Sequence, residues 1–371
     1  MRSLSFIRFP VLFLLVVIVV FSVQATEKKD DKLVFDIAVL YWSMDIPGQV
    51  AMRQGIEDAK EIINAKAHKN NLAVIRLHPF VAGNGEAGIE KQITQLDWIV
   101  DRQDMDLIIV QPTDNAALVK GLIKANKKNI PVVAYDQYIS GGQLASYITS
   151  DNYQAGYLNG EYIASKFDIN YVIKLVLVDY PYVSSTVERV DGFIDALSDN
   201  QQAYTIVSSY QAVEPVAGLK AAKQILHDFP NKHSIDVIFT VNDGGGLNVV
   251  KTLFEAGRDE IKVATIDGDP LSINNILENK LTVINSAQFC KPLGEESLYT
   301  AYDILNGKAV EPHKLIPVFP VTKETLSLYP GWDGPIPGKF RKQWSSTQPF
   351  WKGQISSSTN TDNKSHSLSN E

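Results

Sequence analysis

The chain has 371 residues, a formal net charge of −7 and a single cysteine. An acidic balance argues against nucleic acid or an anionic membrane surface as the main partner, because like charges repel. Cys290 has no second cysteine to pair with, so the fold must be held by its core and not by disulfides. The length exceeds the size at which a single core keeps growing, which predicts two lobes.

The first 25 residues have the pattern of a secretory signal peptide. Arg2 and Arg8 precede an unbroken apolar run at 11–21, and Ser22-Val-Gln-Ala25 forms a small-residue cleavage site. We expect cleavage near Ala25 and export to a bacterial periplasm as a soluble monomer. Loss of the two arginines takes the net charge from −7 to −9. A retained membrane anchor is the alternative, but 11 apolar residues are fewer than the roughly 20 that span a bilayer.

From residue 34 onward, short apolar runs alternate with segments of helical periodicity. The first series predicts strands at 34–41, 72–77, 107–110 and 132–135, with helices at 51–67, about 89–100, 115–127 and 153–166. The second predicts strands at 171–178, 204–209, 237–241, 262–266 and 281–287, with helices near 184–198, 216–228, 245–257 and 270–279. The last part predicts a strand at 313–320, turns at 329–337 and a disordered polar tail at 345–371.

Two such series predict an α/β protein with two doubly wound parallel-sheet lobes, because alternating strands and helices form parallel sheets covered on both faces. Four of the apolar runs end in polar clusters, and ligands of open α/β sheets bind at the carboxyl ends of strands. We therefore expect a small polar ligand at these ends. The clusters are Gln111-Pro-Thr-Asp114, Asp136-Gln137, Asn242-Asp243 and Asp267-Gly-Asp269.

Five short motifs resemble, in order and spacing, those of periplasmic sugar-binding proteins of the ribose-binding type. The resemblance runs from about Val34 to Pro320, and the combined set is specific although each motif alone is weak. The motifs are Ile130-Pro-Val-Val-Ala-Tyr-Asp136, Ser150-Asp-Asn152, Glu188-Arg-Val-Asp-Gly-Phe193, Val241-Asn-Asp243 and Ile266-Asp-Gly-Asp269.

In that family, which has the periplasmic binding protein-like I fold, two lobes joined by a three-strand hinge close over a monosaccharide. They then present it to a membrane permease or to a receptor. The resemblance implies that the chain crosses between lobes near Ser150, Gln288 and Pro317. The implied N-terminal lobe is 34–149 plus 289–317, and the implied C-terminal lobe is 150–288 plus 318–340.

The resemblance also implies a ring of ligand-binding side chains. Asp136 would grip sugar hydroxyls from the first lobe and Arg189 from the second, with Asn242, Asp267 and Gln288 completing the ring. The chemistry agrees, because carboxylates accept hydroxyl hydrogens while arginine and amides donate to hydroxyl oxygens.

Some positions depart from the ribose-binding pattern and count against ribose itself. Gln137 stands where ribose binders carry an arginine, and Gln111 where they carry an asparagine. Gly48-Gln49, after Asp45, replaces the tandem phenylalanines that sandwich the sugar ring. Trp42 would supply an apolar plane instead, or would lie in the core, since a buried indole needs a partner for its N–H. Gln137, Gln111, Trp42 and Asp45 complete the predicted ligand site.

Ordinary structural roles compete for some of these residues. Asp114 and Asp243 precede predicted helices, so we expect helix capping there rather than ligand contact. Gly244-Gly-Gly246 lacks the Walker pattern of a phosphate-binding loop, and close packing or a flexible loop accounts for it better.

Enzymes and repressors fit the sequence poorly. The six histidines show no metal-ligand spacing and there is no Gly-x-Ser-x-Gly elbow, so we expect no catalysis, metal or cofactor. A repressor of this fold needs an N-terminal helix-turn-helix, where this chain has its signal segment. The sequence predicts a protein that closes on a sugar-like, polyhydroxylated ligand and delivers it to an ABC-type permease. A sensing subunit that signals to a histidine kinase or chemoreceptor without transport stays open as the alternative.

Overall fold

The computed structural model describes residues 33–357, so the predicted signal peptide at 1–25 lies outside the described residues. The first elements are β1 (Val34–Tyr41), α1 (Pro47–Asn70), β2 (Val74–Val81), α2 (Gly85–Arg102), β3 (Leu107–Val110), α3 (Val119–Lys127), β4 (Val132–Tyr135) and β5 (Ser146–Ser150). Then come α4 (Asn152–Ala164), β6 (Ile173–Asp179), α5 (Ser184–Asp199), β7 (Tyr204–Gln211), α6 (Pro215–Asp228), β8 (Val237–Thr240), α7 (Asp243–Glu255), β9 (Lys262–Asp267), α8 (Pro270–Leu277) and β10 (Thr282–Ala287). The last are α9 (Cys290–Leu305), β11 (His313–Ile316), β12 (Phe319–Val321), the 3-10 turn η1 (Leu326–Leu328), β13 (Phe340–Arg341), β14 (Phe350–Trp351) and β15 (Ser356–Ser357).

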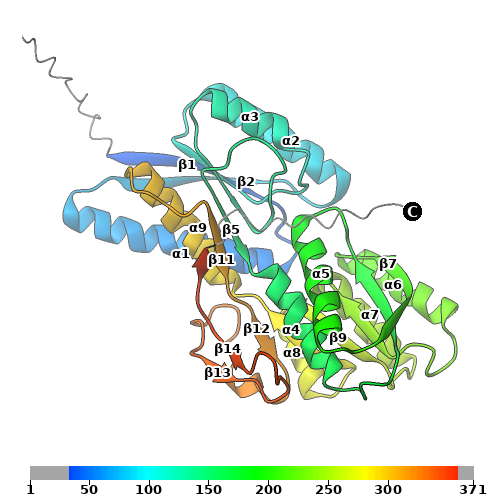
Figure 1. Cartoon of the computed structure of the whole chain (residues 1–371). Helices are drawn as coiled ribbons and strands as arrows, with labels where there is room; N and C mark the ends of the chain where they lie inside the picture. Colours follow the sequence, from blue (N-terminus) through cyan, green and yellow to red (C-terminus); the bar gives the residue numbers. More distant parts are fainter. Residues whose placement is uncertain (1–32, 358–371) are drawn as a thin grey trace, which may run out of the picture. The chain divides into compact units, whose positions relative to one another are not determined.

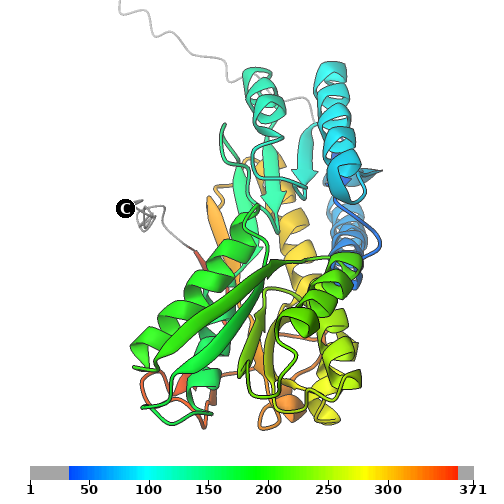
Figure 2. The same cartoon turned by 90° about the vertical axis from the view of Figure 1, so that its right-hand side faces the viewer.

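Two mainly parallel sheets organise these elements into two lobes (Figures 1 and 2). The first lobe has strand order β15-β11-β5-β4-β3-β1-β2, and the second has β12-β10-β9-β8-β6-β7. Within these two sheets all pairings are parallel except those of β15 and β12, which are antiparallel to their neighbours; β13 and β14 form a separate antiparallel pair. The predicted fold class, two doubly wound α/β lobes, is confirmed. The chain passes from one sheet to the other after β5, β10 and β11.

Alternate residues of the central strands face opposite helical layers, which is why these strands read as continuous apolar runs. In β1, Ile37 and Val39 belong to a core cluster with Met52 of α1, whereas Ala38 and Leu40 belong to a second cluster with the helices α2 and α3. The sheet of the first lobe therefore has α1 and α9 on one face and α2 and α3 on the other (Figure 1). None of the helices within 33–357 is long and apolar enough to cross a membrane.

The helix α5, which carries Arg189, packs unusually close to α4. Gly156 and Gly160 on α4 face the backbone carbonyls of Arg189 and Phe193, and a Cβ at either glycine would clash with them. Gly192 on α5 meets the backbone of α4 in the same way. The absence of side chains at these three positions lets the two helix backbones approach each other. This close packing sets the backbone position from which the Arg189 side chain extends to the cavity.

Two features of the C-terminal third differ from the sequence expectation. The helix α9 was not predicted, because Pro292 in its first turn and Gly294 in its second weaken a helical pattern; Gly294 in fact packs against the backbone of α1. The single strand expected at 313–320 is two strands in different sheets, β11 and β12, since the chain crosses between the lobes at 317–318.

The disorder expected for residues 345–371 does not hold for 345–357. This part contains β14 and β15, and Ser345 and Trp351 are buried. The indole N–H of Trp351 donates to the carbonyl of Val318 at 2.7 Å. Polar composition suggested a solvated tail, but the segment buries Trp351 with its N–H satisfied and pairs β15 with β11 of the first lobe. Residues 358–371 lie outside the described part.

Candidate functional site

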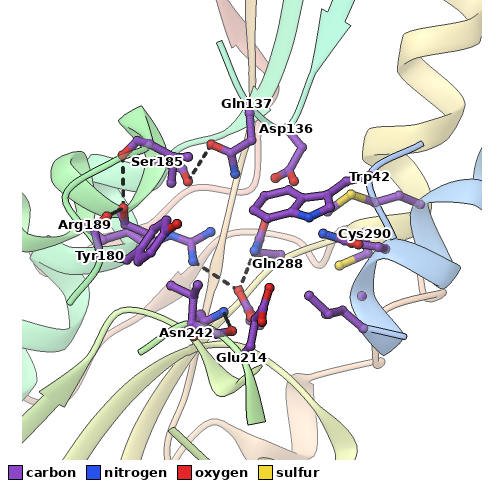
Figure 3. A pocket seen from close by; sticks show the side chains of 18 residues that line it. Trp42, Asp136, Gln137, Tyr180, Ser185, Arg189, Glu214, Asn242, Gln288 and Cys290 are labelled. Carbon is purple, nitrogen blue, oxygen red and sulfur yellow. Dashed lines mark hydrogen bonds and ion pairs between the residues drawn. The ribbon is translucent and has the colours of Figure 1, made fainter. Parts of the chain in front are cut away.

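A cavity of about 60 Å³ lies where the carboxyl ends of strands from both lobes meet. Seven of the nine predicted ligand-binding residues line it, and Figure 3 shows the side chains that it labels converging from both lobes. The seven are Trp42, Asp136, Gln137, Arg189, Asn242, Asp267 and Gln288. The other two predicted residues, Gln111 and Asp45, are not part of the lining.

Gln111 lies behind the cavity and positions two residues that line it. Its amide Nε2 donates to Oδ2 of Asp136 at 2.8 Å, and its Oε1 accepts from the backbone N–H of Trp42 at 3.2 Å. It is fully buried. The structure thus places Gln111 in support of Asp136 and Trp42, rather than in the lining. Asp45 is exposed and accepts a hydrogen bond from Asn84 at 3.2 Å, away from the cavity.

Asp136 is a buried carboxyl without an ion-pair partner among residues 33–357. Its side chain accepts from Gln111, and its backbone carbonyl accepts from the hydroxyls of Tyr147 and Thr149. Burial raises the pKa of Asp136, although the hydrogen bond from Gln111 and the charge of Arg189 oppose this. A carboxyl held in this way is short of hydrogen-bond donors, so a ligand that supplies donors would satisfy it.

Arg189, Asp267 and Gln288 form a connected network on the opposite side of the cavity. Nη1 of Arg189 lies 3.2 Å from Oδ1 of Asp267 and donates to the carbonyl of Val241 at 2.8 Å, while Nε donates to Asn152 at 2.9 Å. Nε2 of Gln288 donates to the same Oδ1 at 2.6 Å. Burial raises the pKa of Asp267 against the charge of Arg189. The guanidinium is held at two nitrogens, and none of residues 33–357 accepts a hydrogen bond from Nη2.

Two side-chain hydrogen bonds join residues of the two lobes at the cavity. The hydroxyl of Ser185, at the start of α5, donates to Oε1 of Gln137 at 3.0 Å (Figure 3). Gln137 belongs to the first lobe and Ser185 to the second. Near the second crossing between lobes, Ser150 donates to Oε1 of Gln288 at 2.7 Å. The described conformation is therefore one in which the lobes touch across the site.

The helix-capping role expected of Asp243 belongs to the residue before it, Asn242. Asn242, predicted to contact ligand, lines the cavity and also caps α7: its Oδ1 accepts from Gly245 N at 3.0 Å and its Nδ2 donates to Val213 O at 2.9 Å. Asp243, predicted to cap a helix, does not. Its carboxylate accepts instead from Thr265, Asn285 and the backbone N–H of Asp269. Burial, followed by the nearby charge of Asp267, raises the pKa of Asp243.

The other structural roles were predicted correctly. Asp114 accepts from the backbone N–H groups of Ala116 and Ala117 at 2.8 and 2.7 Å and so caps the turn that leads into α3. Gly245 and Gly246 pack closely, because a Cβ at these positions would lie 2.6 Å from the carbonyl of Ala212 and 2.5 Å from the hydroxyl of Thr240.

Some residues that line the cavity were not predicted from the sequence. Tyr180 directly follows β6 and Glu214 lies just beyond β7, so the rule of strand ends, applied to these two strands, would have found both. Ser185 lies in the first turn of α5 and Cys290 begins α9, and only the tertiary structure brings them to the cavity. Burial raises the pKa of the Cys290 thiol well above its usual range. Within 33–357, no group of three or more His, Cys, Asp or Glu side chains is arranged to hold a metal ion.

Two α/β lobes, three crossings and a polar cavity at the strand ends between them define a two-lobed binding protein. The family described as "Periplasmic binding protein domain" matches residues 37–309, and the chain belongs to that family. The sequence is 26% identical over 281 residues to the ribose import binding protein of Bacillus subtilis, covering 76% of this chain and 85% of that protein. The predicted resemblance to the ribose-binding type is confirmed.

Two solved structures show the same fold. A periplasmic solute-binding protein of an ABC transporter from Actinobacillus succinogenes, with bound D-allose, has a TM-score of 0.66 and 24% identity and covers 80% of this chain and 100% of its own. The fructose-binding periplasmic domain of a hybrid two-component system has a TM-score of 0.68 and 22% identity and covers 79% of this chain and 92% of its own. These relatives are binding proteins and not enzymes, and the same holds for this chain.

Proposed function

We propose that this protein is an exported solute-binding protein that closes on a sugar or a similar polyhydroxylated small molecule. One observation carries the proposal: both lobes present charged hydrogen-bonding groups to one cavity. Asp136 comes from the first lobe, and Arg189 and Asp267 from the second. A relative that binds ribose and a structural neighbour with bound D-allose support a sugar as ligand.

The chemistry of the cavity suits hydroxyl groups, which both donate and accept. The carboxyl of Asp136 accepts a hydrogen bond from Gln111 and can accept more, and Nη2 of Arg189 is not used by residues 33–357, so a hydroxyl lying between them would donate to Asp136 and accept from Arg189. Trp42 lines the cavity and offers an apolar ring for the C–H face of a sugar. The departures at Gln137 and Gly48-Gln49 favour a ligand other than ribose.

Ligand would act by stabilising the closed arrangement of the lobes. Only when the lobes meet can Asp136 and Arg189 contact the same molecule, so the ligand binds that state more tightly and shifts the population toward it. The hydrogen bond from Ser185 to Gln137 belongs to the same state.

For the downstream partner we propose an ABC-type permease that receives the ligand from the mature protein, cleaved near Ala25. The second candidate is a sensing subunit, which the likeness to a periplasmic domain of a two-component system favours. Deletion of the gene separates them. Loss of ligand uptake supports transport, whereas loss of a ligand-dependent transcriptional response with unchanged uptake supports sensing.

A thermal-shift screen against monosaccharides and polyols tests the ligand class. A compound present at about 100 times its dissociation constant adds about 2.7 kcal/mol to stability and should raise the melting temperature clearly. Each hit is then repeated with Asp267→Asn in the cavity and with Asp259→Asn, an exposed carboxylate of the same lobe, as control. A shift that disappears only in the first variant supports the proposal. No shift with any polyhydroxylated compound, or an equal shift in all three proteins, contradicts it.

A further inference from the structure

The third crossing between the lobes is very short and has a second chain segment beside it. β11 ends at Ile316 in the first sheet and β12 begins at Phe319 in the second, so only Pro317 and Val318 connect them. Ile316, Val318 and Phe319 are fully buried. A hinge that bends here must change the angle between two strands separated by two residues.

Residues 350–357 run antiparallel to this crossing and bind it on both sides. On the second-lobe side, Nε1 of Trp351 donates to the carbonyl of Val318 at 2.7 Å. On the first-lobe side, Ser356 and Ser357 of β15 pair with Leu315 and Lys314 of β11. Trp351 contacts Val318 and Ser357 pairs with Lys314, so the two segments run in opposite directions. The C-terminal segment therefore makes a fourth passage between the lobes, alongside the third.

The second-lobe end of this segment is firmly anchored. Lys342 Nζ lies 2.6 Å from Oε2 of Glu161 on α4, and the two side chains are 3% and 0% exposed. Trp344 also donates to that Oε2, at 3.2 Å. The rings of Phe340 and Trp351 pack on Phe319 with centroids 5.3 and 5.2 Å away. Movement of Phe319 during hinge bending would carry the segment with it.

We propose that residues 350–357 act as a splint across the third crossing and hold the lobes in the described, touching arrangement. Opening that bends residues 316–319 must either break the pairing of β15 with β11 or break the bond from Trp351 to Val318. The splint lies beyond residues 37–309, which match the binding protein family. It therefore adds resistance to opening that the three crossings alone would not give, whichever ligand the cavity takes.

The test compares two truncations of the mature chain without ligand. One ends after Lys352 and removes β15 while keeping Lys342 and Trp351 in place. The control ends after Ser357 and removes none of the described residues. Hydrogen exchange by mass spectrometry reports on peptides that cover 313–321 and 146–150, and small-angle X-ray scattering reports the radius of gyration. We expect about tenfold faster exchange in both peptides and a larger radius for the shorter chain only, because the pairing of β15 with β11, which ties the segment to the first lobe, is lost.

Two results would overturn the splint. One is an unchanged radius of gyration in the shorter chain. The other is faster exchange confined to β11, which would mean that β15 only protects an edge strand from fraying. If the shorter chain melts at a much lower temperature, Trp351→Phe decides, because it keeps an aromatic side chain and removes the N–H that bonds to Val318. A larger radius in that variant supports the splint, and an unchanged radius rejects it.

Discussion

Asp136 and Asp267 hold corresponding places in the two lobes, and both have a backbone conformation that side chains rarely adopt. Asp136 directly follows β4 with φ 63°, and Asp267 ends β9 with φ 117°. Positive φ in a residue other than glycine costs on the order of 1–3 kcal/mol and persists only where the surroundings impose it. This unfavourable backbone conformation occurs once in each lobe, at two residues that line the same cavity. We take this as physical support for a binding role of both carboxyls.

The first prediction concerns the charge of Asp136. Asp136→Asn keeps the shape and the hydrogen bond from Gln111 but removes a buried charge, so the ligand-free melting temperature should stay the same or rise. Binding of a polyhydroxylated ligand should weaken by about 1.5–3 kcal/mol, roughly 10- to 150-fold. Calorimetry on Asp136→Asn and on Asp45→Asn, an exposed aspartate outside the cavity, provides the comparison. Equal losses in the two variants would show that Asp136 has no special part in binding.

The second prediction concerns the bond between the lobes. Ser185→Ala removes the donor to Gln137, which exists only while the lobes touch, so we expect about fivefold weaker ligand binding, equivalent to about 1 kcal/mol. Ser184→Ala is the matched control, because the hydroxyl of Ser184 is buried with no hydrogen-bond partner within 33–357. Titration calorimetry measures both. A loss of affinity in Ser184→Ala as large as in Ser185→Ala would assign the effect to helix α5 in general.

The third prediction is a dependence of stability on pH that comes from Glu188. Burial, with the charge of Asp151 adding to it, raises the pKa of Glu188 from 4.5 to about 7. A carboxyl whose pKa is raised in the folded state makes its full contribution to the free energy of unfolding below the pKa of the unfolded state. That contribution is lost as the pH rises through the pKa of the folded state. The free energy of unfolding should therefore fall between about pH 4.5 and pH 7, by up to about 3 kcal/mol. Urea unfolding at pH 5 and pH 8 measures the difference.

Glu188→Gln removes the titrating group and should flatten this pH dependence. Glu255→Gln, at an exposed position of α7, should leave it as in the parent protein. A difference between pH 5 and pH 8 that survives unchanged in Glu188→Gln would assign the effect to other carboxyls.

The fourth prediction concerns the buried pair of Glu161 and Lys342. Lys342→Met leaves the carboxylate of Glu161 buried without its cation. We expect this to lower the free energy of unfolding by about 3–5 kcal/mol, the usual cost of an uncompensated buried charge. The double variant Glu161→Gln/Lys342→Met should recover much of the loss, because no charge is then buried. Denaturant unfolding of the single and double variants measures this. If the single and double variants are equally destabilised, the packing of the aliphatic part of the Lys342 side chain accounts for the loss and the unpaired charge of Glu161 does not.

Most of the strands and helices, and the strand ends that line the cavity, could be predicted from the sequence, although β5 and α9 were not. Buried parallel strands are apolar on both faces, and polar residues such as Asp136 and Asp267 follow them directly, so local pattern is sufficient there. The family resemblance then singled out Arg189 and Gln288, both of which line the cavity.

Other roles were decided by partners far apart in the chain. Gln111 looks like a ligand contact in the sequence but supports Asp136 from behind, and Asn242, which lines the cavity, also caps α7. Ser185 meets Gln137 only because two lobes come together, and Trp351 orders a polar segment by reaching Val318, 33 residues earlier. Sequence pattern records which residues are apolar and how they are spaced, whereas the partner that satisfies a polar group is fixed by long-range packing.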